Sequence, residues 1–140
     1  MWPGAITRLE ALLADRVRVL GPDHPDTLTT SNDLARWRGE SGDVAAAITG
    51  FEALLADQWR VLGADHPDTL STRHDLAYWR AQSGDVAGAI AESQALLPDR
   101  VRVLGADHPD TLRTRHNLAY WRDKASDTSG AARDAGSSDS

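Results

Sequence analysis

The sequence LGADHPDTL at residues 62–70 decides the fold, because it occurs three times in this chain of 140 residues. It returns unchanged at 104–112, and it stands at 20–28 with proline in place of the alanine. Successive copies are 42 residues apart. A fixed period of this size is typical of one supersecondary unit that is copied and stacked, each copy covering the apolar face that its neighbour leaves open.

Amphipathic helices are predicted on both sides of every copy. Apolar residues recur at i, i+3, i+4 and i+7 from residue 3 to residue 20, and Gly21 suits the end of that helix. Pro25 suits the first turn of the next helix, with Asp23 or His24 placed to cap it. No segment alternates apolar and polar residues, so strands are not expected. The same pattern along the chain predicts six helices, at about 3–20, 25–41, 44–62, 67–83, 86–104 and 109–122.

The last segment, 123–140, is rich in Ser, Asp, Ala and Gly and has no large apolar residue. Such a composition cannot bury enough apolar surface to order a chain, so we expect a disordered tail with at most a frayed turn. Its register is informative, because Asp127 aligns with Asp43, which is placed to cap the helix at 44–62. The predicted organisation is one helical-repeat domain at 1–122, incomplete at both ends, followed by a tail at 123–140.

The spacing inside one unit resembles that of the tetratricopeptide repeat. That repeat has a large and a small residue on its first helix, a turn, and then a small and an aromatic residue on its second helix. Here these positions are Leu34-Ala35, Gly42-Asp43, Ala47 and Phe51, and the next unit has Ser93 in place of the aromatic residue. The usual period is about 34 residues. The longer period and the Leu-Gly-x-Asp-His-Pro joint look like the long repeats of kinesin light chains and of many bacterial multi-repeat proteins.

This resemblance implies an all-α, right-handed superhelical solenoid of antiparallel helix pairs. We call the helices at 25–41, 67–83 and 109–122 the A helices and the other three the B helices, so that the order is B-A-B-A-B-A. HEAT and armadillo arrays have periods in the same range. They do not explain the glycine-aspartate turn or the pairing of Ala47 with Phe51.

Composition narrows the classes of partner. A net charge of −6 disfavours nucleic acid and anionic membranes, which need an excess of Lys and Arg on one face. The absence of cysteine excludes disulfides, thiolate zinc sites and a cysteine nucleophile. The first residues show no basic segment followed by an apolar one, and no apolar run approaches the length of a membrane span. We therefore expect a cytoplasmic protein with no nucleic-acid or membrane partner.

The three A helices can be compared with one another inside this one chain. At about 100° per residue, most positions that differ between the copies fall in one arc of about 120°, which also includes Gly39 and Ala81. The constant positions fill the rest of the wheel, and their three tryptophans are expected to pack one repeat on the next. The candidate peptide-binding residues on the variable arc are Thr29, Asn32, Asp33, Arg36, Ser71, His74, Asp75, Tyr78, Arg113, His116, Asn117 and Tyr120.

In tetratricopeptide repeats the same stripe lines a concave groove that holds an extended peptide. The resemblance implies that four amide or imidazole side chains reach the peptide backbone: Asn32, His74, His116 and Asn117. A plain solvated face would also vary between copies, because surface positions drift when packing does not fix them. The rings of Tyr78 and Tyr120 favour binding, since tyrosine is enriched in binding surfaces.

The predicted function is a protein-protein interaction module that holds a peptide or protein segment in this groove, with no cofactor or metal. The alternative is a structural or self-assembling unit whose open ends join head to tail. The residues expected at those ends are Ile6, Leu9, Leu13, Leu118 and Trp121. An enzyme that uses the Asp-His pairs is disfavoured, because the pair recurs at every A-helix start, where capping explains it. No glycine-rich phosphate loop, HExxH or GxSxG motif occurs.

Overall fold

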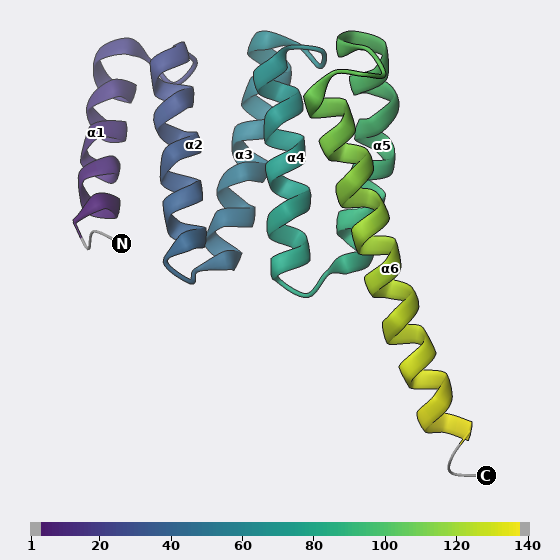
Figure 1. Ribbon diagram of the computed structural model, residues 1–140. Helices are drawn as coiled ribbons and strands as arrows, with labels where there is room; N and C mark the ends of the chain where they lie inside the picture. Colours follow the sequence, from purple (N-terminus) through teal and green to yellow (C-terminus); the bar gives the residue numbers. More distant parts are fainter. Residues whose placement is uncertain (1–3, 138–140) are drawn as a thin grey trace.

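The chain folds as a row of antiparallel helices (Figure 1). A computed structural model describes residues 4–137, with side chains described through residue 127. These residues form six helices and no strand, as the repeat pattern predicted. The helices are α1 (Ala5–Leu20), α2 (Pro25–Glu40), α3 (Val44–Leu62), α4 (Pro67–Gln82), α5 (Val86–Leu104) and α6 (Pro109–Ser137).

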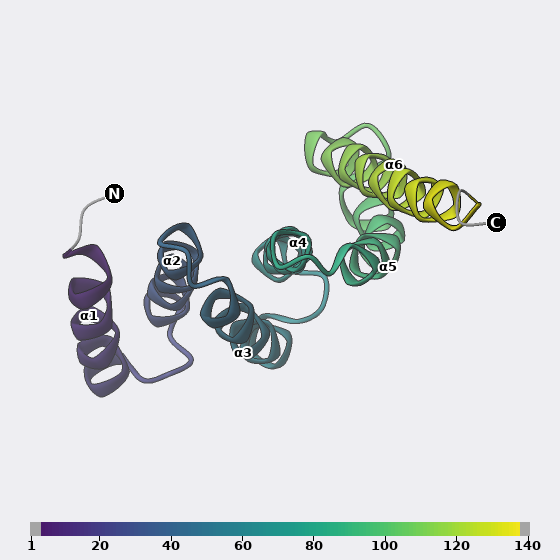
Figure 2. The same cartoon turned by 90° about the horizontal axis from the view of Figure 1, so that it is seen from below.

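The six helices form two layers (Figure 2). Seen along the helix axes, the A helices α2, α4 and α6 lie in one layer and the B helices α1, α3 and α5 lie in the other. Consecutive helices pack against one another along the whole row. This is the stacking that a tandem repeat requires, because each unit contacts only its neighbours.

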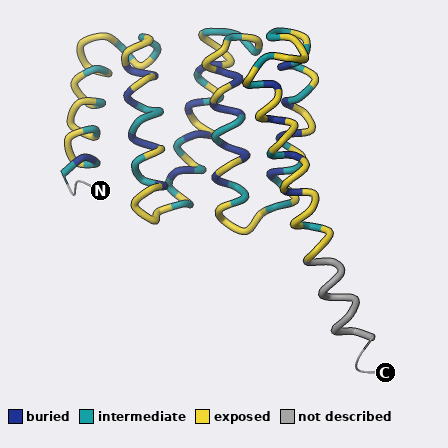
Figure 3. The backbone as a smooth tube through the Cα atoms, in the orientation of Figure 1, coloured by how far each residue is buried: buried dark blue, intermediate teal, exposed yellow. Residues whose placement is uncertain are grey.

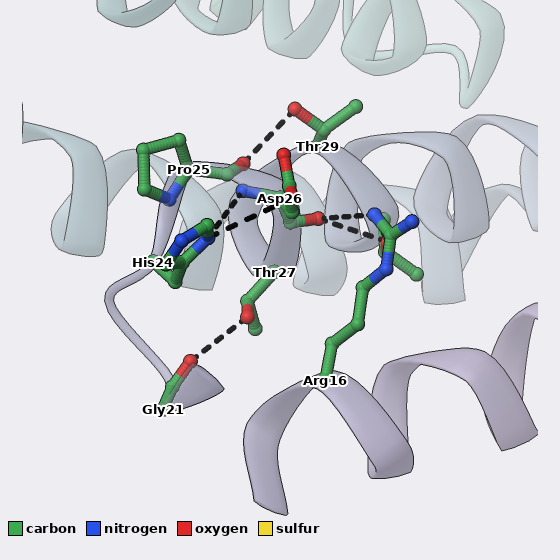
Figure 4. A network of polar contacts seen from close by, with 8 residues as sticks. Arg16, Gly21, His24, Pro25, Asp26, Thr27 and Thr29 are labelled. Atoms are coloured by element: carbon green, nitrogen blue, oxygen red, sulfur yellow. Dashed lines mark hydrogen bonds and ion pairs between the residues drawn. The ribbon is translucent and has the colours of Figure 1, made fainter. Parts of the chain in front are cut away.

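Every A helix begins at a histidine. The Nδ1 atom of His24 accepts a hydrogen bond from the backbone N–H of Asp26 at 3.1 Å (Figure 4), and His66 and His108 make the same bond in the other two copies. The proline after the histidine occupies the first helical position, where its missing N–H has no cost. Of the two capping candidates, the histidine is therefore the cap.

A glycine turn joins each of the first two A helices to the following B helix. Gly42 and Gly84 have φ angles of 103° and 96°, a left-handed conformation that residues with a side chain rarely adopt. Asp43 then caps α3 by accepting a hydrogen bond from the backbone N–H of Ala46 at 3.1 Å, and the second turn repeats this bond. The turn and the cap together reverse the chain within a few residues.

The main core lies between α2, α3 and α4. Phe51 and Leu54 of α3 are buried there together with Leu76 and Trp79 of α4. Buried positions follow the facing sides of the helices (Figure 3). A second cluster between α4, α5 and α6 is smaller, because the buried residue that aligns with Phe51 is Ser93.

The repeated tryptophans pack one A helix against the preceding one. Trp79 is buried against Gly39 of α2, and Trp121 is buried in the second cluster. Trp37 is only partly buried, because no A helix precedes α2 in this chain. The packing prediction is confirmed for Trp79 and Trp121. Gly39, which the sequence placed on the variable arc, is not a surface residue, because the indole of Trp79 covers it.

The end of the chain differs from the predicted tail. α6 runs without a break from Pro109 to Ser137, and its last turns extend past the other helices (Figure 1). The reason lies at residue 126, which is serine where the two earlier units have Gly42 and Gly84. Serine disfavours the left-handed conformation that the turn requires, so the helix continues. Lys124 also lies over the ring of Tyr120, 5.6 Å from its centroid, which favours helix at this point.

The open end of α6 is formed by residues other than those predicted. Leu118 and Trp121 are buried, because they face the preceding unit and not a missing next one. The exposed apolar residue is Leu112, which is 48% exposed, whereas the equivalent Leu28 is 4% exposed under α3.

On α1, too, the exposed apolar residues differ from those predicted. The predicted Ile6, Leu9 and Leu13 are partly buried. The large apolar residues that α1 leaves exposed are Leu12, Val17, Val19 and Leu20.

Candidate binding groove

The twelve predicted binding residues all lie on α2, α4 and α6, which form one layer of the solenoid (Figure 2). None of them is fully buried. The exposed ones are Thr29, Arg36, Ser71, Tyr78, Arg113, His116 and Tyr120. The partly buried ones are Asn32, Asp33, His74, Asp75 and Asn117.

A cavity of about 370 Å³ brings four of these residues together. Thr29 and Asn32 line it from α2, and Ser71 and Asp75 line it from α4. The other eight predicted residues do not line this cavity. The stretch between α2 and α4 is thus a concave site built by two neighbouring A helices.

The floor of the cavity comes from a B helix, which the sequence comparison missed. Gln58 and Leu62 of α3 line the cavity, as do His66 and Asp68 at the start of α4. The sequence does contain a signal for Gln58, because aligning the three B helices at the 42-residue spacing places Arg16 and Arg100 at the same position.

Asp75 is a half-buried carboxylate in this cavity. Burial raises the pKa of Asp75 above its ordinary value, while the positive charge of Arg36 and a hydrogen bond from Asn32 act in the opposite direction. Arg36 is itself paired with Asp33 at 3.0 Å. The lining residues include two carboxylates, Asp68 and Asp75, and no Lys or Arg. This half of the groove is therefore acidic.

The half between α4 and α6 has the opposite charge. The pKa of His74 is lowered to about 4, mainly by burial and also by the nearby charges of Arg100 and Arg113, with Asp110 opposing them. His74 is neutral at pH 7 for this reason, and the positive charge here belongs to the two arginines. Tyr120 lies on the same helix as Arg113, with Lys124 over its ring. This half of the groove is therefore basic and aromatic.

The B helices place an arginine under the groove in two of the three units. Nη1 of Arg16 donates hydrogen bonds to the backbone oxygen of Asp26 and to Oγ1 of Thr30, both at 2.9 Å (Figure 4). Arg100 makes the same pair of bonds in the third unit, to Asp110 and Thr114 at 3.0 and 2.8 Å. Gln58 stands at this position in the middle unit, is 4% exposed, and leaves its Oε1 without a hydrogen-bond partner in the described chain.

The Asp-His-Pro joints make structural contacts. The histidine caps the A helix in all three copies, and in the first two the preceding aspartate binds an arginine on the next B helix. Asp23 accepts two hydrogen bonds from Arg60, at 2.8 and 3.0 Å, which lower the pKa of the carboxyl, and Asp65 pairs with Arg102 in the same way. Within residues 4–127, no three His, Cys, Asp or Glu side chains are grouped so that they could hold a metal ion.

Comparison with known proteins identifies the type of repeat. A family model described as tetratricopeptide repeat matches residues 2–26 and 69–110. A solved structure of a Podosopora anserina protein, described as a kinesin light chain with nearly identical TPR-like repeats, is 29% identical, with a TM-score of 0.76 over 84% of this chain. The structure of BtubC (BKLC) from P. vanneervenii has a TM-score of 0.78 over 92% of this chain at 19% identity, a similarity of fold alone.

The chain is shorter than these neighbours. It spans 56% of the Podosopora structure and 52% of the BtubC structure, little more than half of each. A search of curated proteins finds no match. Among the described residues, no helix is both long enough and apolar enough to cross a bilayer.

Proposed function

Because this chain is a tetratricopeptide-repeat solenoid similar to those of kinesin light chains, we propose that it holds an extended segment of another protein in the groove lined by α2, α4 and α6. The observation that carries the proposal is the cavity, where Thr29 and Asn32 from one A helix meet Ser71 and Asp75 from the next. Polar groups that converge on a concave site from two elements are typical of ligand-binding surfaces.

The two tyrosines of the groove support the same function. The side chains of Tyr78 and Tyr120 are 44% and 52% exposed, so packing does not explain them. The rings of Tyr78 and Trp79 make a T-shaped contact with their centroids 5.0 Å apart, which holds the exposed tyrosine ring in place. Rigid, amphipathic rings of this kind supply contact area at a small cost in conformational entropy.

A displayed library of random peptides, selected on the whole chain, tests the proposal. We expect Tyr78→Ala and Tyr120→Ala each to weaken the selected peptides by about 1–2 kcal/mol, as is usual for interface anchors. Trp59→Ala is the matched control, because it removes an equally exposed ring from the B-helix layer. Affinity that is unchanged by both tyrosine variants, or that falls only because the variants lose helicity in circular dichroism, would refute the proposal.

A second candidate function is head-to-tail self-association, favoured by one repeated ion pair. Asp23 pairs with Arg60 and Asp65 with Arg102, so each joint aspartate binds the arginine 37 residues further on. The third joint aspartate is Asp107, which is exposed. Arg18 of α1 occupies the position that Arg60 and Arg102 have on the other B helices.

The apolar residues at the two ends match in the same register. Leu28 is buried with Leu62 packed against its cluster, and the equivalent residues at the two ends, Leu112 and Leu20, are both exposed. A second copy that docks α1 on α6 would cover both leucines and pair Arg18 with Asp107 in the geometry already present twice. Such a heterologous contact need not close, so it would give chains of growing length.

Sedimentation velocity over a range of concentrations tests the assembly. We expect association that Arg18→Asp and Asp107→Arg each weaken and that the double variant restores, because the swapped charges pair again. Asp65→Arg cannot replace Asp107→Arg in this test, because Asp65 already pairs with Arg102 inside the same chain. A single monomeric species at all concentrations would exclude self-association.

A further inference from the structure

The floor of the cavity between α2 and α4 breaks the repeat pattern at one residue. Gln58 on α3 occupies the position that Arg16 has on α1 and Arg100 has on α5. In those two units the guanidinium reaches a backbone oxygen and a threonine hydroxyl of the next A helix. The middle unit therefore lacks the hydrogen-bonded arginine that both of its neighbours have, which is buried in the third unit and partly buried in the first.

The substitution leaves polar groups without partners. Gln58 lines the cavity, and its Oε1 is buried with no hydrogen-bond partner in the chain. The hydroxyl of Thr72 has none either, although the equivalent hydroxyls of Thr30 and Thr114 accept hydrogen bonds from the arginines. Buried polar groups in folded proteins are nearly always paired. The amide oxygen of Gln58 therefore lacks an N–H donor, which a ligand from outside the chain can supply.

The walls of the cavity carry negative charge without a cation among the lining residues. Asp68 and Asp75 line it, and Arg36 on the neighbouring surface is already paired with Asp33. Burial raises the pKa of Asp75, which shows that its present partners do not fully offset the loss of water around the carboxylate. A positive group placed here would restore the balance.

We propose that this cavity binds the basic side chain, lysine or arginine, of a protein segment held in the groove, an inference that rests on the proposed function. The incoming cation supplies the charge that an arginine supplies in the other two units, next to Asp75 and Gln58. An acidic side chain would meet two carboxylates, and an apolar one would desolvate Asp75 further without pairing it. The volume of about 370 Å³ lies at the lower end of the range for small-ligand sites and admits one long side chain.

An NMR titration of the whole chain tests the inference with capped tripeptides that differ only in the central residue. The probes are acetyl-Ala-Lys-Ala-amide and its counterparts with central glutamine or glutamate. We expect the lysine peptide to shift the side-chain amide signals of Gln58 and Asn32 saturably and to bind about tenfold more tightly than the glutamine peptide, as for a charge-assisted contact. Equal affinities, a preference for glutamate, or shifts confined to residues outside the cavity would overturn it.

Three variants separate the cavity from general charge effects. Asp75→Asn introduces the residue that α6 has at the equivalent position and is expected to weaken the lysine peptide about tenfold. Asp123→Asn makes the same change at an exposed residue of α6 outside the cavity and should change the affinity by less than about twofold. Gln58→Arg copies the other two units and is expected to abolish binding while the thermal midpoint is kept or raised. Undiminished binding of the lysine peptide by Asp75→Asn or by Gln58→Arg would refute the inference.

The library peptides distinguish failure of the cation site from failure of the proposed peptide-binding groove. Library peptides that depend on Tyr78 and Tyr120 but contain no basic residue, or that bind Asp75→Asn as well as wild type, would overturn the cation site and leave the groove in place. Library peptides that bind independently of both tyrosines would overturn the groove itself.

Discussion

Replacing Gly39 by alanine is expected to destabilise the fold, although alanine is the better helix former. Gly39 lies in the last turn of α2, and an ideal Cβ there would lie 2.6 Å from Cη2 and 2.7 Å from Cζ2 of Trp79. Ordinary carbon-carbon contacts are about 3.5–4.0 Å long, so the indole would have to move by about 1 Å. Trp79 has little freedom to do so, because it is buried in the same cluster as Phe51 and Leu54.

Two opposing effects set the size of the change. Alanine is about 1 kcal/mol more favourable than glycine in a helix. Extra atoms in a well-packed core cost about 1–3 kcal/mol, and the rigid, buried indole places this case in the upper part of that range. We therefore expect Gly39→Ala to lower the free energy of unfolding by about 1 kcal/mol.

Urea unfolding followed by circular dichroism measures this difference, and Ala81→Gly is the matched control. Ala81 is the equivalent residue of α4 and packs against the cluster of Ala77, Ala89 and Trp121. Removing its methyl group loses helix propensity and packing, so Ala81→Gly should also cost about 1 kcal/mol. Gly39→Ala and Ala81→Gly are opposite substitutions at equivalent positions, and both would then lower the free energy of unfolding. A Gly39→Ala variant more stable than wild type would refute the claim that Trp79 closes this position.

Three further predictions concern pH, α5 and the turns. The pKa of His74 is about 4 in the fold and about 6.5 in an unfolded chain, so the unfolded chain binds the proton more readily. The free energy of unfolding should fall by at most about 3 kcal/mol as the pH drops from 6.5 to 4, and His74→Asn should make the urea midpoint depend less on pH over that range. Pro98→Ala should raise the thermal midpoint, gaining about 1–3 kcal/mol, because Pro98 lies inside α5 and cannot donate its helical hydrogen bond; an unchanged midpoint would contradict this. Gly42→Ala should cost about 1–2 kcal/mol in urea unfolding, because φ is 103°; a neutral effect would argue against the left-handed turn.

The repeat made the helices predictable, because every local signal occurs two or three times in the same register. The identity of the A-helix cap was not predictable, since Asp23 and His24 both offer an acceptor atom. In the structure the histidine directly before the proline is the cap in all three copies, while Asp23 binds Arg60 of the next B helix. A partner 37 residues away is outside the reach of a local pattern.

The tail shows a different kind of error, in which composition was given more weight than position. Few apolar residues argued for disorder after Arg122, yet a helix ends only where something ends it. In the first two units that residue is a glycine with positive φ, and at the third it is Ser126. The alignment that placed Asp127 under Asp43 already contained this substitution.

Comparing the copies selected residues from one layer of the solenoid, but it did not give the depth at which each of them lies. All twelve candidates lie in the A-helix layer, and four of them surround the cavity. Variation between copies does not distinguish an open surface from a position under a neighbouring ring, so Gly39 was misplaced. It also does not extend to another helix, so Gln58 was not considered.

Gln58 is the most informative difference between the units, because it is a buried position that varies. Surface positions change freely, and positions that seat one repeat on the next, such as those of Trp79 and Trp121, stay the same because both neighbours constrain them. Glutamine in place of arginine at this position removes the hydrogen bonds that the other units have, and the described chain supplies no partner for the amide oxygen or for Thr72. Local rules that a protein breaks at a cost in stability are broken most often at functional sites. The position where this chain departs from its own repeat is also the floor of its acidic cavity, so we expect the middle unit to be the one that contacts the partner most closely.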